Sequence, residues 1–330
     1  MIKHINIPKE NYDEWVNFRT SGIGASEVGT ILGLNPYKSA TELFYQKIGK
    51  IPQKIDQNLA MFMGNRLEPF VADLWQYYHE DEATMMSNYD NGVKTRHFDT
   101  IEGYLINEDY PHMFFSPDGL IKNDSKLSAY SIDKQGVVSF DNTKGVLEIK
   151  TISGFASKQW ENGVPPSYIV QLMTYMIGLD KKYGEIVFFE DGRKINVIEL
   201  SRSESICDQI LQQTSEFWER VQGALNDMEN CELYEPEPEG TTAYESFLNK
   251  KYAESEAKTI QGTDEMYEYA HKHKLVLDEI KELEGTATEA TNFLKNFMKE
   301  HDTIDFGAGG KVTWKTNARG FRTFKNSIKL

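Results

Sequence analysis

The sequence predicts an α/β (α+β) protein in which helices flank a mixed central β-sheet, with a helical arm near the C-terminus. Three observations lead to this prediction. Short apolar runs, typical of buried strands, alternate with longer amphipathic segments over the first 225 residues. The segment 167–179 is apolar nearly all round, as expected of a helix packed against a sheet. Beyond residue 264, apolar residues recur at alternating three- and four-residue steps, the pattern of a coiled coil or helical hairpin.

The composition is that of an ordinary soluble protein, with 39% hydrophobic and 26% charged residues among 330. No apolar run approaches the length of a membrane span, and residues 1–6 lack the apolar region of a secretory signal. The two cysteines, Cys207 and Cys231, show no metal-ligand spacing. We therefore expect a cytoplasmic protein with no membrane contact.

The net charge of −15 disfavours nucleic-acid binding, because phosphate contacts depend on Lys and Arg. The charges are unevenly distributed, however. Residues 226–240 hold six acidic and no basic residues, whereas no acidic residue follows Asp305. The basic residues of this C-terminal tail are Lys311, Lys315, Arg319, Arg322, Lys325 and Lys329. A local basic surface is thus compatible with the acidic total.

The N-terminal region predicts a short helix at 12–18, followed by a segment of small residues. Ser26 is the expected N-cap of a helix over 27–32. Exposed backbone amides at a helix start, with Arg19 nearby, suit an anion such as a terminal phosphate. An ordinary glycine turn with a helix cap is the alternative.

The next elements place a carboxylate beside a buried stripe. Helices are expected at 40–48 and 58–78, and Glu68 lies next to the apolar positions of the second. Such a carboxylate is usually a solvated neighbour of the core, and it becomes important if it faces the same cleft as Asp118. Strands are expected at 97–100, 102–106, 113–121 and 136–140, the last within a polar stretch over 122–144.

The run 145–151 is predicted to be a buried strand that carries both an acid and a base. Side chains alternate across a strand, so Glu148 and Lys150 point to the same face. Buried charges are costly unless they pair or hold a metal. If an adjacent strand brings Asp118 beside them, the three residues would form a metal-dependent site for phosphodiester cleavage. An exposed strand pair is the alternative explanation for an isolated Glu-x-Lys.

The remaining elements complete the sheet and the arm. Gln171 is the one polar interior residue of the apolar helix 167–179, and a buried amide requires partners. We expect a domain over 1–225, an acidic linker over 226–240 with Pro236 and Pro238, and an arm and basic tail over 241–330. The further elements are a short helix at 157–161, strands at 183–190 and 194–200, a helix at 204–225 and the heptad-like seam over 264–300.

Taken together, residues 15–200 resemble the lambda exonuclease / YqaJ-like viral recombinase family of PD-(D/E)xK nucleases. Several motifs match in order, each on the expected element. Arg19 and Ser26 resemble the 5′-phosphate pocket, Glu68 the helical glutamate, Asp118 the motif aspartate, Glu148 and Lys150 the Glu-x-Lys strand, and Gln171 the helix glutamine.

The resemblance implies a restriction-endonuclease-like core with two Mg²⁺ ions, for which Mn²⁺ can substitute. Asp118 would bridge the ions, Glu148 and the Ile149 carbonyl would bind the first, and Glu68 the second. Lys150, its pKa lowered by bound Mg²⁺, would orient or deprotonate the attacking water. Gln171 would position Lys150 or that water.

The function implied is a 5′→3′ exonuclease that degrades one strand of linear duplex DNA from 5′-phosphorylated ends and leaves 3′ overhangs. The resemblance further implies a ring-shaped homotrimer, a single-strand annealing protein as partner, and a phage or prophage gene expressed in a bacterial cytoplasm. A structure-specific or restriction-like endonuclease and a non-catalytic DNA-end-binding scaffold are the alternatives. The heptad-like arm would contact the annealing partner or pack against the core.

Overall fold

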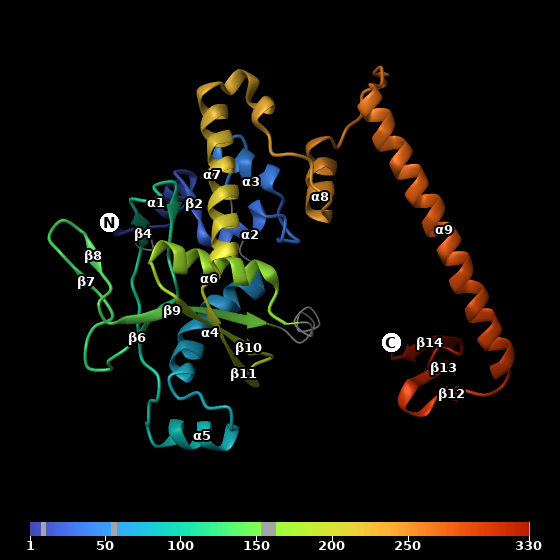
Figure 1. Cartoon of the computed structure of the whole chain (residues 1–330), viewed down its shortest axis with the longest axis horizontal. Helices are drawn as coiled ribbons and strands as arrows, with labels where there is room; N and C mark the ends of the chain where they lie inside the picture. Colours follow the sequence, from blue (N-terminus) through green and yellow to red (C-terminus); the bar gives the residue numbers. More distant parts are fainter. Residues whose placement is uncertain (8–10, 54–57, 153–162, 330) are drawn as a thin grey trace. The chain divides into compact units, whose positions relative to one another are not determined.

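The structure is a computed structural model that describes residues 1–329 except 8–10, 54–57 and 153–162. The chain forms two compact units, Met1–Glu254 and Ser255–Leu330. The first unit contains a mixed central sheet with helices on both faces, which confirms the predicted fold class (Figure 1).

The central sheet has five strands in the order β11-β10-β9-β6-β3. Its middle strand β9 (Thr143–Ile152) pairs parallel with β10 (Tyr183–Glu190) and antiparallel with β6 (Gly119–Lys122). Parallel neighbours need a crossover connection, and α6 (Pro166–Gly178) supplies it between β9 and β10. The outer strands are β11 (Lys194–Ser201) and β3 (Phe98–Asp99).

Two helices bury opposite faces of this sheet. Leu172 and Met176 of α6 share an apolar cluster with Val146 of β9. Val71 and Trp75 of α4 (Leu59–Trp75) belong to a second cluster, which contains Leu147, Ile149 and Val187. Because side chains alternate along β9, even-numbered residues face α6 and odd-numbered ones face α4. This parity decides which residues of β9 can meet at a site.

Smaller elements surround the sheet in the first unit. Six of them, β1, β2, α5, β7, η3 and α8, lie where no helix or strand was predicted. The predicted helix at 157–161 lies outside the described residues. The bounds are β1 (Ile2–Ile5), α1 (Tyr12–Thr20), β2 (Ile23–Gly24), η1 (Ala25–Glu27), α2 (Val28–Ile31), α3 (Ala40–Lys47), α5 (Glu82–Asp90), β4 (Tyr104–Asn107), β5 (Met113–Phe114), β7 (Ser131–Ile132), β8 (Val138–Ser139), α7 (Glu204–Asn226), η3 (Met228–Tyr234) and α8 (Thr242–Lys251).

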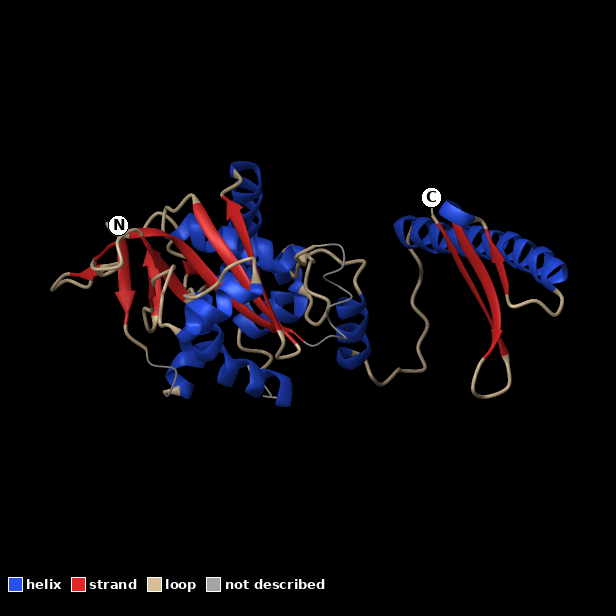
Figure 2. Cartoon of the chain, turned by 90° about the horizontal axis from the view of Figure 1, so that it is seen from below, coloured by secondary structure: helices blue, strands red, loops and turns tan. Residues whose placement is uncertain are grey.

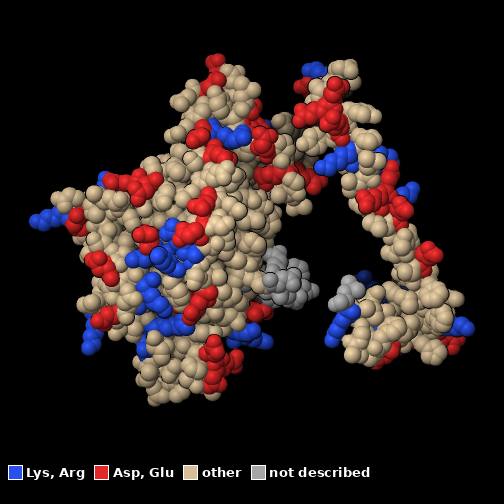
Figure 3. All heavy atoms as spheres, in the orientation of Figure 1, with Lys and Arg blue, Asp and Glu red and all other residues tan. Residues whose placement is uncertain are grey.

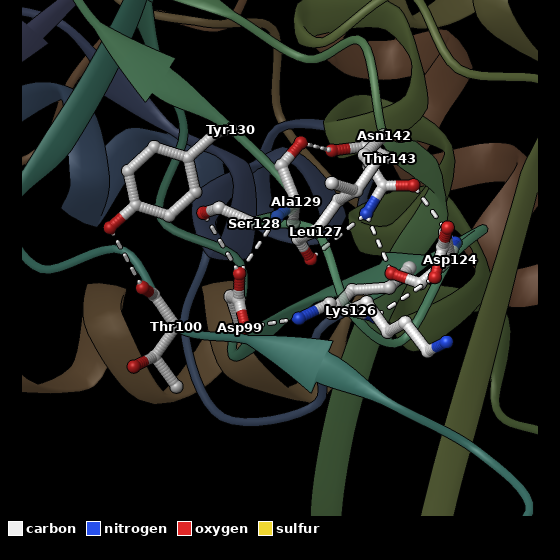
Figure 4. A network of polar contacts seen from close by, with 11 residues as sticks. Asp99, Thr100, Asp124, Lys126, Leu127, Ser128, Ala129, Tyr130, Asn142 and Thr143 are labelled. Carbon is white, nitrogen blue, oxygen red and sulfur yellow. Dashed lines mark hydrogen bonds and ion pairs between the residues drawn. The ribbon is translucent and has the colours of Figure 1, made fainter.

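The polar stretch between β6 and β9 is folded back onto the sheet edge by side-chain hydrogen bonds (Figure 4). Asp99 of β3 accepts hydrogen bonds from the Ala129 amide at 2.7 Å and the Ser128 hydroxyl at 3.1 Å. The Asn142 amide donates to the Asp124 and Leu127 carbonyls. The stretch is therefore an ordered insertion at the β3 edge of the sheet.

The acidic segment expected as a linker packs within the first unit. Cys231 of η3 is fully buried, and the Arg220 guanidinium of α7 donates to the Glu235 carbonyl at 2.7 Å. Gly223 lies so close to Tyr234 that an added Cβ would come within 2.5 Å of its ring. The boundary between units thus follows Glu254, not residue 225, because the apolar residues of this segment outweigh its charge.

The second unit is one long helix and a three-stranded antiparallel sheet. The helix α9 (Asp264–Met298) is continuous, so the alternative of a helical hairpin is wrong. The residues after α9 form the strands β12 (Thr303–Asp305), β13 (Gly310–Thr316) and β14 (Arg322–Ile328). The short turn η4 (Gly307–Gly309) lies between β12 and β13, and the basic tail contributes β13 and β14. Figure 2 shows these strands running alongside α9. Met298 and Val312, each 1% exposed, mark the contact between helix and sheet.

Candidate active site

Glu148 lies at the centre of a polar cluster between β9 and α6. Its side chain is almost completely buried, with the residue 1% exposed. The Lys150 ammonium donates a hydrogen bond to Glu148 Oε1, and Gln171 Nε2 donates to the same oxygen at 2.7 Å. Gln171 was expected to position Lys150 or a water, and in the structure its amide donates to Glu148 and to the Tyr175 hydroxyl. The even-numbered face of β9 and the inward face of α6 bring these three residues together.

The second carboxylate oxygen of Glu148 is buried and accepts no hydrogen bond from the residues that the structure describes. The pKa of Glu148 is raised to about 8, chiefly by burial, then by the negative charge of Asp118. The positive charge of Lys150 opposes this shift but does not cancel it. A buried carboxylate with an unused oxygen and an unfavourable negative charge would be stabilised by a cation.

Asp118 lies beside Glu148 because of the register between β6 and β9. Gly119 pairs with Leu147, so the residue before Gly119 lies next to Glu148. Asp118 Oδ2 accepts a hydrogen bond from the Ile149 amide at 2.7 Å. The predicted convergence of Asp118 and the Glu-x-Lys strand therefore occurs in the structure. Metal binding through the Ile149 carbonyl remains a prediction.

Glu68 approaches the cluster from α4, the helix on the other face of the sheet. It is half-buried, and its negative charge contributes to the raised pKa of Glu148. Gly64, one turn earlier, allows this approach, because an added Cβ would be only 3.2 Å from the Thr151 hydroxyl of β9. Glu68 is therefore within electrostatic reach of Glu148 without sharing its face of the strand.

Two tyrosines of α6 belong to the cluster and were not predicted from the sequence. The Tyr175 hydroxyl donates to the Ser116 carbonyl at 3.0 Å and accepts a hydrogen bond from Gln171 at 3.2 Å. The Lys150 ammonium lies 5.2 Å from the centroid of the Tyr168 ring. Both tyrosines share a helix face with Gln171, three and four residues away, and this spacing was the available signal.

The donor set fits Mg²⁺ better than a metal that needs a closed cage. Among the residues that the structure describes, no three His, Cys, Asp or Glu side chains are placed to hold a metal ion together, so Glu68 does not complete a three-carboxylate set with Asp118 and Glu148. Mg²⁺ usually keeps several waters and takes only one or two protein carboxylates. Asp118 and the unused oxygen of Glu148 provide such hard oxygen donors.

A second charged cluster surrounds Glu27, which is 6% exposed. Arg19 Nη2 lies 3.0 Å from Glu27 Oε1, and Lys47 Nζ lies 2.7 Å from Glu27 Oε2. These cations lower the pKa of Glu27 to about 2 despite its burial. The pKa of Lys47 is lowered to about 8, first by burial and then by the nearby charges of Arg19 and Lys38. Three cations therefore surround Glu27, and together they exceed its single negative charge.

Ser26 has a different local role from the one predicted. It lies within η1, exposed, and its side chain does not cap α2, so the N-cap prediction is wrong. The Glu27 carboxylate instead accepts a hydrogen bond from the Gly24 amide at 2.9 Å, at the start of η1. Arg19 and Ser26 remain candidates for binding a 5′-phosphate, and Lys38 and Lys47 are additional candidates that the sequence did not indicate.

The two charged clusters meet across α6. Burial raises the pKa of Tyr175, the charges of Glu148 and Asp118 raise it further, and the positive charge of Arg19 opposes them. In addition, α2 packs closely on the start of α6, since an added Cβ at Gly29 would be 3.0 Å from Ser167 Cβ. Tyr175 of α6 therefore lies within electrostatic range of both clusters.

The surface charge is mixed, as far as the view in Figure 3 shows. Acidic and basic side chains are interspersed over the face of the first unit in that view. This face is therefore not uniformly acidic, although the net charge of the chain is −15. Within the described part of the chain, helices are either too short or too polar to cross a membrane.

Comparison with known proteins places the chain in a family. Residues 14–180 match the model of the YqaJ-like viral recombinase domain. The chain is 30% identical over 308 residues to the uncharacterized protein YqaJ of Bacillus subtilis strain 168, covering 92% of this chain and 83% of that protein.

Two solved structures are also similar. One is an alkaline exonuclease from Laribacter hongkongensis, with a TM-score of 0.48 and 17% identity over 67% of this chain and 98% of that one. The other is a phage related exonuclease from Haemophilus somnus 129PT, with a TM-score of 0.40 and 12% identity over 63% of this chain and 96% of that one. The match to the domain model over half of the chain shows that this protein belongs to the YqaJ-like viral recombinase family.

Proposed function

We propose that the protein is a metal-dependent deoxyribonuclease that degrades one strand of linear duplex DNA in the 5′→3′ direction. The observation that carries this proposal is the cluster of Asp118, Glu148 and Lys150, in which one buried oxygen of Glu148 has no hydrogen-bond donor in the described part of the chain. Such a cluster has the acids to hold Mg²⁺ and a lysine to act on water.

The residues of the cluster have distinct proposed roles. Mg²⁺ bound by Asp118 and Glu148, with Glu68 nearby, would supply a hydroxide and neutralise charge on the scissile phosphate. Burial lowers the pKa of Lys150, but the charges of Glu148 and Asp118 raise it above its ordinary value, contrary to the expected lowering, which would require bound Mg²⁺. Lys150 would therefore orient the attacking water as an ammonium, from its position beside Glu148 and over the Tyr168 ring. Gln171 would hold Glu148 in place through its 2.7 Å hydrogen bond. Tyr175 would hold Gln171 in turn.

The direction of degradation is proposed from the cluster around Glu27. Arg19, Lys38 and Lys47 have three positive charges, which the two carboxylates near them, Glu27 and Glu42, do not balance. A terminal phosphate, with up to two negative charges, suits such an excess better than an internal phosphodiester with one. Binding of the 5′-phosphate there, across α6 from Glu148, would place the first phosphodiester at the carboxylates. Degradation would leave 3′ overhangs.

The proposal includes the assembly that the family resemblance implies. A ring-shaped homotrimer would enclose the duplex, which would provide processivity to a chain with a net charge of −15. A single-strand annealing protein would receive the 3′ overhang during recombination.

The decisive experiment is a time course on linear duplex DNA labelled at either end in turn, with Mg²⁺ or with EDTA. The proposal expects mononucleotide release from the 5′ end, only with Mg²⁺, and faster from 5′-phosphate than from 5′-hydroxyl ends. Lys150→Ala should abolish release, whereas Lys194→Ala, an exposed lysine on β11 of the same sheet, should not. Cleavage of closed circular DNA would instead indicate an endonuclease, and binding without cleavage a DNA-end-binding scaffold.

A further inference from the structure

The three-stranded sheet of the second unit has one covered and one open face. On the covered face, Val312 is 1% exposed. The Lys295 ammonium of α9 lies 5.4 Å from the Trp314 ring centroid and 5.7 Å from that of Phe324. Side chains alternate along β13 and β14. The residues that neighbour Val312, Trp314 and Phe324 in sequence on these strands therefore point away from the helix. The register therefore identifies the residues of the open face.

The open face consists almost entirely of lysines and hydroxyl residues. Three lysines lie there with four hydroxyl side chains and a single carboxylate. In the part of the chain that the structure describes, no carboxylate lies within ion-pair distance of these lysines, and all three are exposed. The residues of the open face are Thr303, Asp305, Lys311, Thr313, Lys315, Thr323, Lys325 and Ser327.

Arg322, another basic residue of this sheet, is used for structure. Arg322 Nε donates to the Trp314 carbonyl at 2.9 Å, and its Nη2 donates to the His301 carbonyl at 2.7 Å. The guanidinium lies 3.7 Å from the Trp314 ring centroid. Arg322 thus joins the end of α9 to the sheet, and the lysines of the open face have no comparable internal task.

The chemistry of this face matches the backbone of a polyanion. Ammonium and hydroxyl groups are standard donors to phosphate oxygens. Lys311 and Lys315 are four residues apart on one strand, and Lys325 pairs opposite Thr313 between them. The three ammoniums therefore span about 13 Å, a length over which a DNA duplex carries roughly eight negative charges. This face is therefore locally basic in a chain whose net charge is −15.

The face suits duplex DNA better than a single strand. Proteins that bind single strands stack bases on aromatic side chains, and the open face has none. Trp314 and Phe324 point to the covered face, where Lys295 lies over their rings. Only the phosphate backbone is available to a flat surface of lysines and hydroxyls.

We propose that the open face formed by β12, β13 and β14 binds the phosphate backbone of duplex DNA, as a contact separate from the nuclease site. This inference rests on the proposed action on duplex DNA, and it adds a second, sequence-independent grip on the undegraded part of the same substrate.

The test is equilibrium binding of the full-length chain to a fluorescent blunt duplex in EDTA, followed by anisotropy as the salt concentration rises. The Lys311→Ala/Lys315→Ala/Lys325→Ala variant should weaken the dependence of log affinity on log salt by up to about 2.7, since each phosphate contact contributes about 0.9. Wild-type affinity should then fall about 40-fold more than that of the variant between roughly 50 and 200 mM salt. The corresponding Lys→Gln triple variant should behave in the same way.

The matched control removes three exposed lysines from α9: Lys272→Ala/Lys274→Ala/Lys281→Ala. It should bind like wild type, and all variants should melt at the wild-type temperature. The inference would be overturned if the open-face and control variants lost the same affinity for duplex DNA, or if neither lost any. It would also be overturned if wild type did not bind duplex DNA, or if the open-face variant lost more affinity for single-stranded than for duplex DNA. EDTA prevents metal-dependent cleavage, so lysine-dependent binding without nuclease activity in Mg²⁺ would refute only the proposed function.

Discussion

The clusters around Glu148 and Glu27 contain the same kinds of residue and behave in opposite ways. Each has a buried glutamate in contact with a lysine. The pKa of Glu148 is raised to about 8, whereas that of Glu27 is lowered to about 2. Burial raises both values, so the neighbours decide the difference. Glu148 has acids beside its one lysine, while Glu27 has Arg19 and Lys47 in direct contact.

The comparison teaches that the balance of charge around a buried carboxylate indicates its ligand. The first cluster has an excess of acid, and a cation would relieve it. The second has an excess of base, and an anion would relieve it. A phosphodiester held between a metal ion and a terminal-phosphate pocket needs one cluster of each sign.

The largest expected effect comes from neutralising the acidic cluster. Glu148→Gln should reduce cleavage in Mg²⁺ by at least about 10²–10⁴-fold, the contribution of a positioned acid–base group, because metal binding and the contact with Lys150 are both lost. Because burial and the charge of Asp118 disfavour the negative charge of Glu148 without metal, the neutral variant should fold at least as stably as wild type. Single-turnover cleavage in Mg²⁺ measures the rate, and thermal unfolding in EDTA measures the stability. Wild-type rates in Mg²⁺ would remove Glu148 from the mechanism.

The same substitution in the basic cluster should affect folding first. Glu27→Gln leaves Lys47, whose side chain is fully buried, without its partner and should lower the free energy of unfolding by about 3–5 kcal/mol. Urea denaturation measures this value. Glu42→Gln on the neighbouring helix α3 is the control and should stay near wild type. Equal stability of the two variants would show that Glu27 is not essential to the cluster.

The two clusters should give stability profiles of opposite slope against pH. The pKa of Glu27 is about 2 when folded and near 4.5 when unfolded, so its contribution, about 3 kcal/mol, is present above pH 4.5 and lost as pH falls toward 2. The pKa of Glu148 is raised when folded, so its contribution is present below pH 4.5 and lost as pH rises toward 8.

Denaturation in EDTA across this range, for wild type and the two Gln variants, separates these contributions. Each variant should flatten only its own part of the profile. A Glu148→Gln profile that changes below pH 4 but not above would contradict the assignment of the shifts.

The smallest effect should come from the edge of the basic cluster. Lys38→Ala removes a cation that contacts Gln46 rather than Glu27, so folding should be little affected. Loss of one charge-assisted contact should reduce the preference for 5′-phosphate over 5′-hydroxyl ends by roughly 10–100-fold. The ratio of initial rates on the two substrates is the measurement, with Lys50→Ala, a more exposed lysine just after α3, as control. An unchanged ratio would place the terminal phosphate elsewhere.

Much of the fold and part of the site could be predicted because they depend on local pattern. The apolar run around Glu148 predicted β9, and alternation alone placed Glu148 and Lys150 on one face. The apolar pattern of α6 likewise predicted that Gln171 is buried. By contrast, the acidic composition of residues 226–240 indicated a linker, although Cys231 and Tyr234 pack against α7. Composition describes the average of a segment, whereas packing depends on its few apolar residues.

The sequence by itself determined which residues lie on each strand and helix face, since φ/ψ preferences and side-chain periodicity are local. Only the tertiary structure decided which faces meet. The contact of Lys47 with Glu27, twenty residues away, and the choice of Glu148 as the partner of Gln171 depend on how helices pack on the sheet. The sign of each pKa shift depends on the same packing, because burial and neighbouring charge arise from residues distant in the chain.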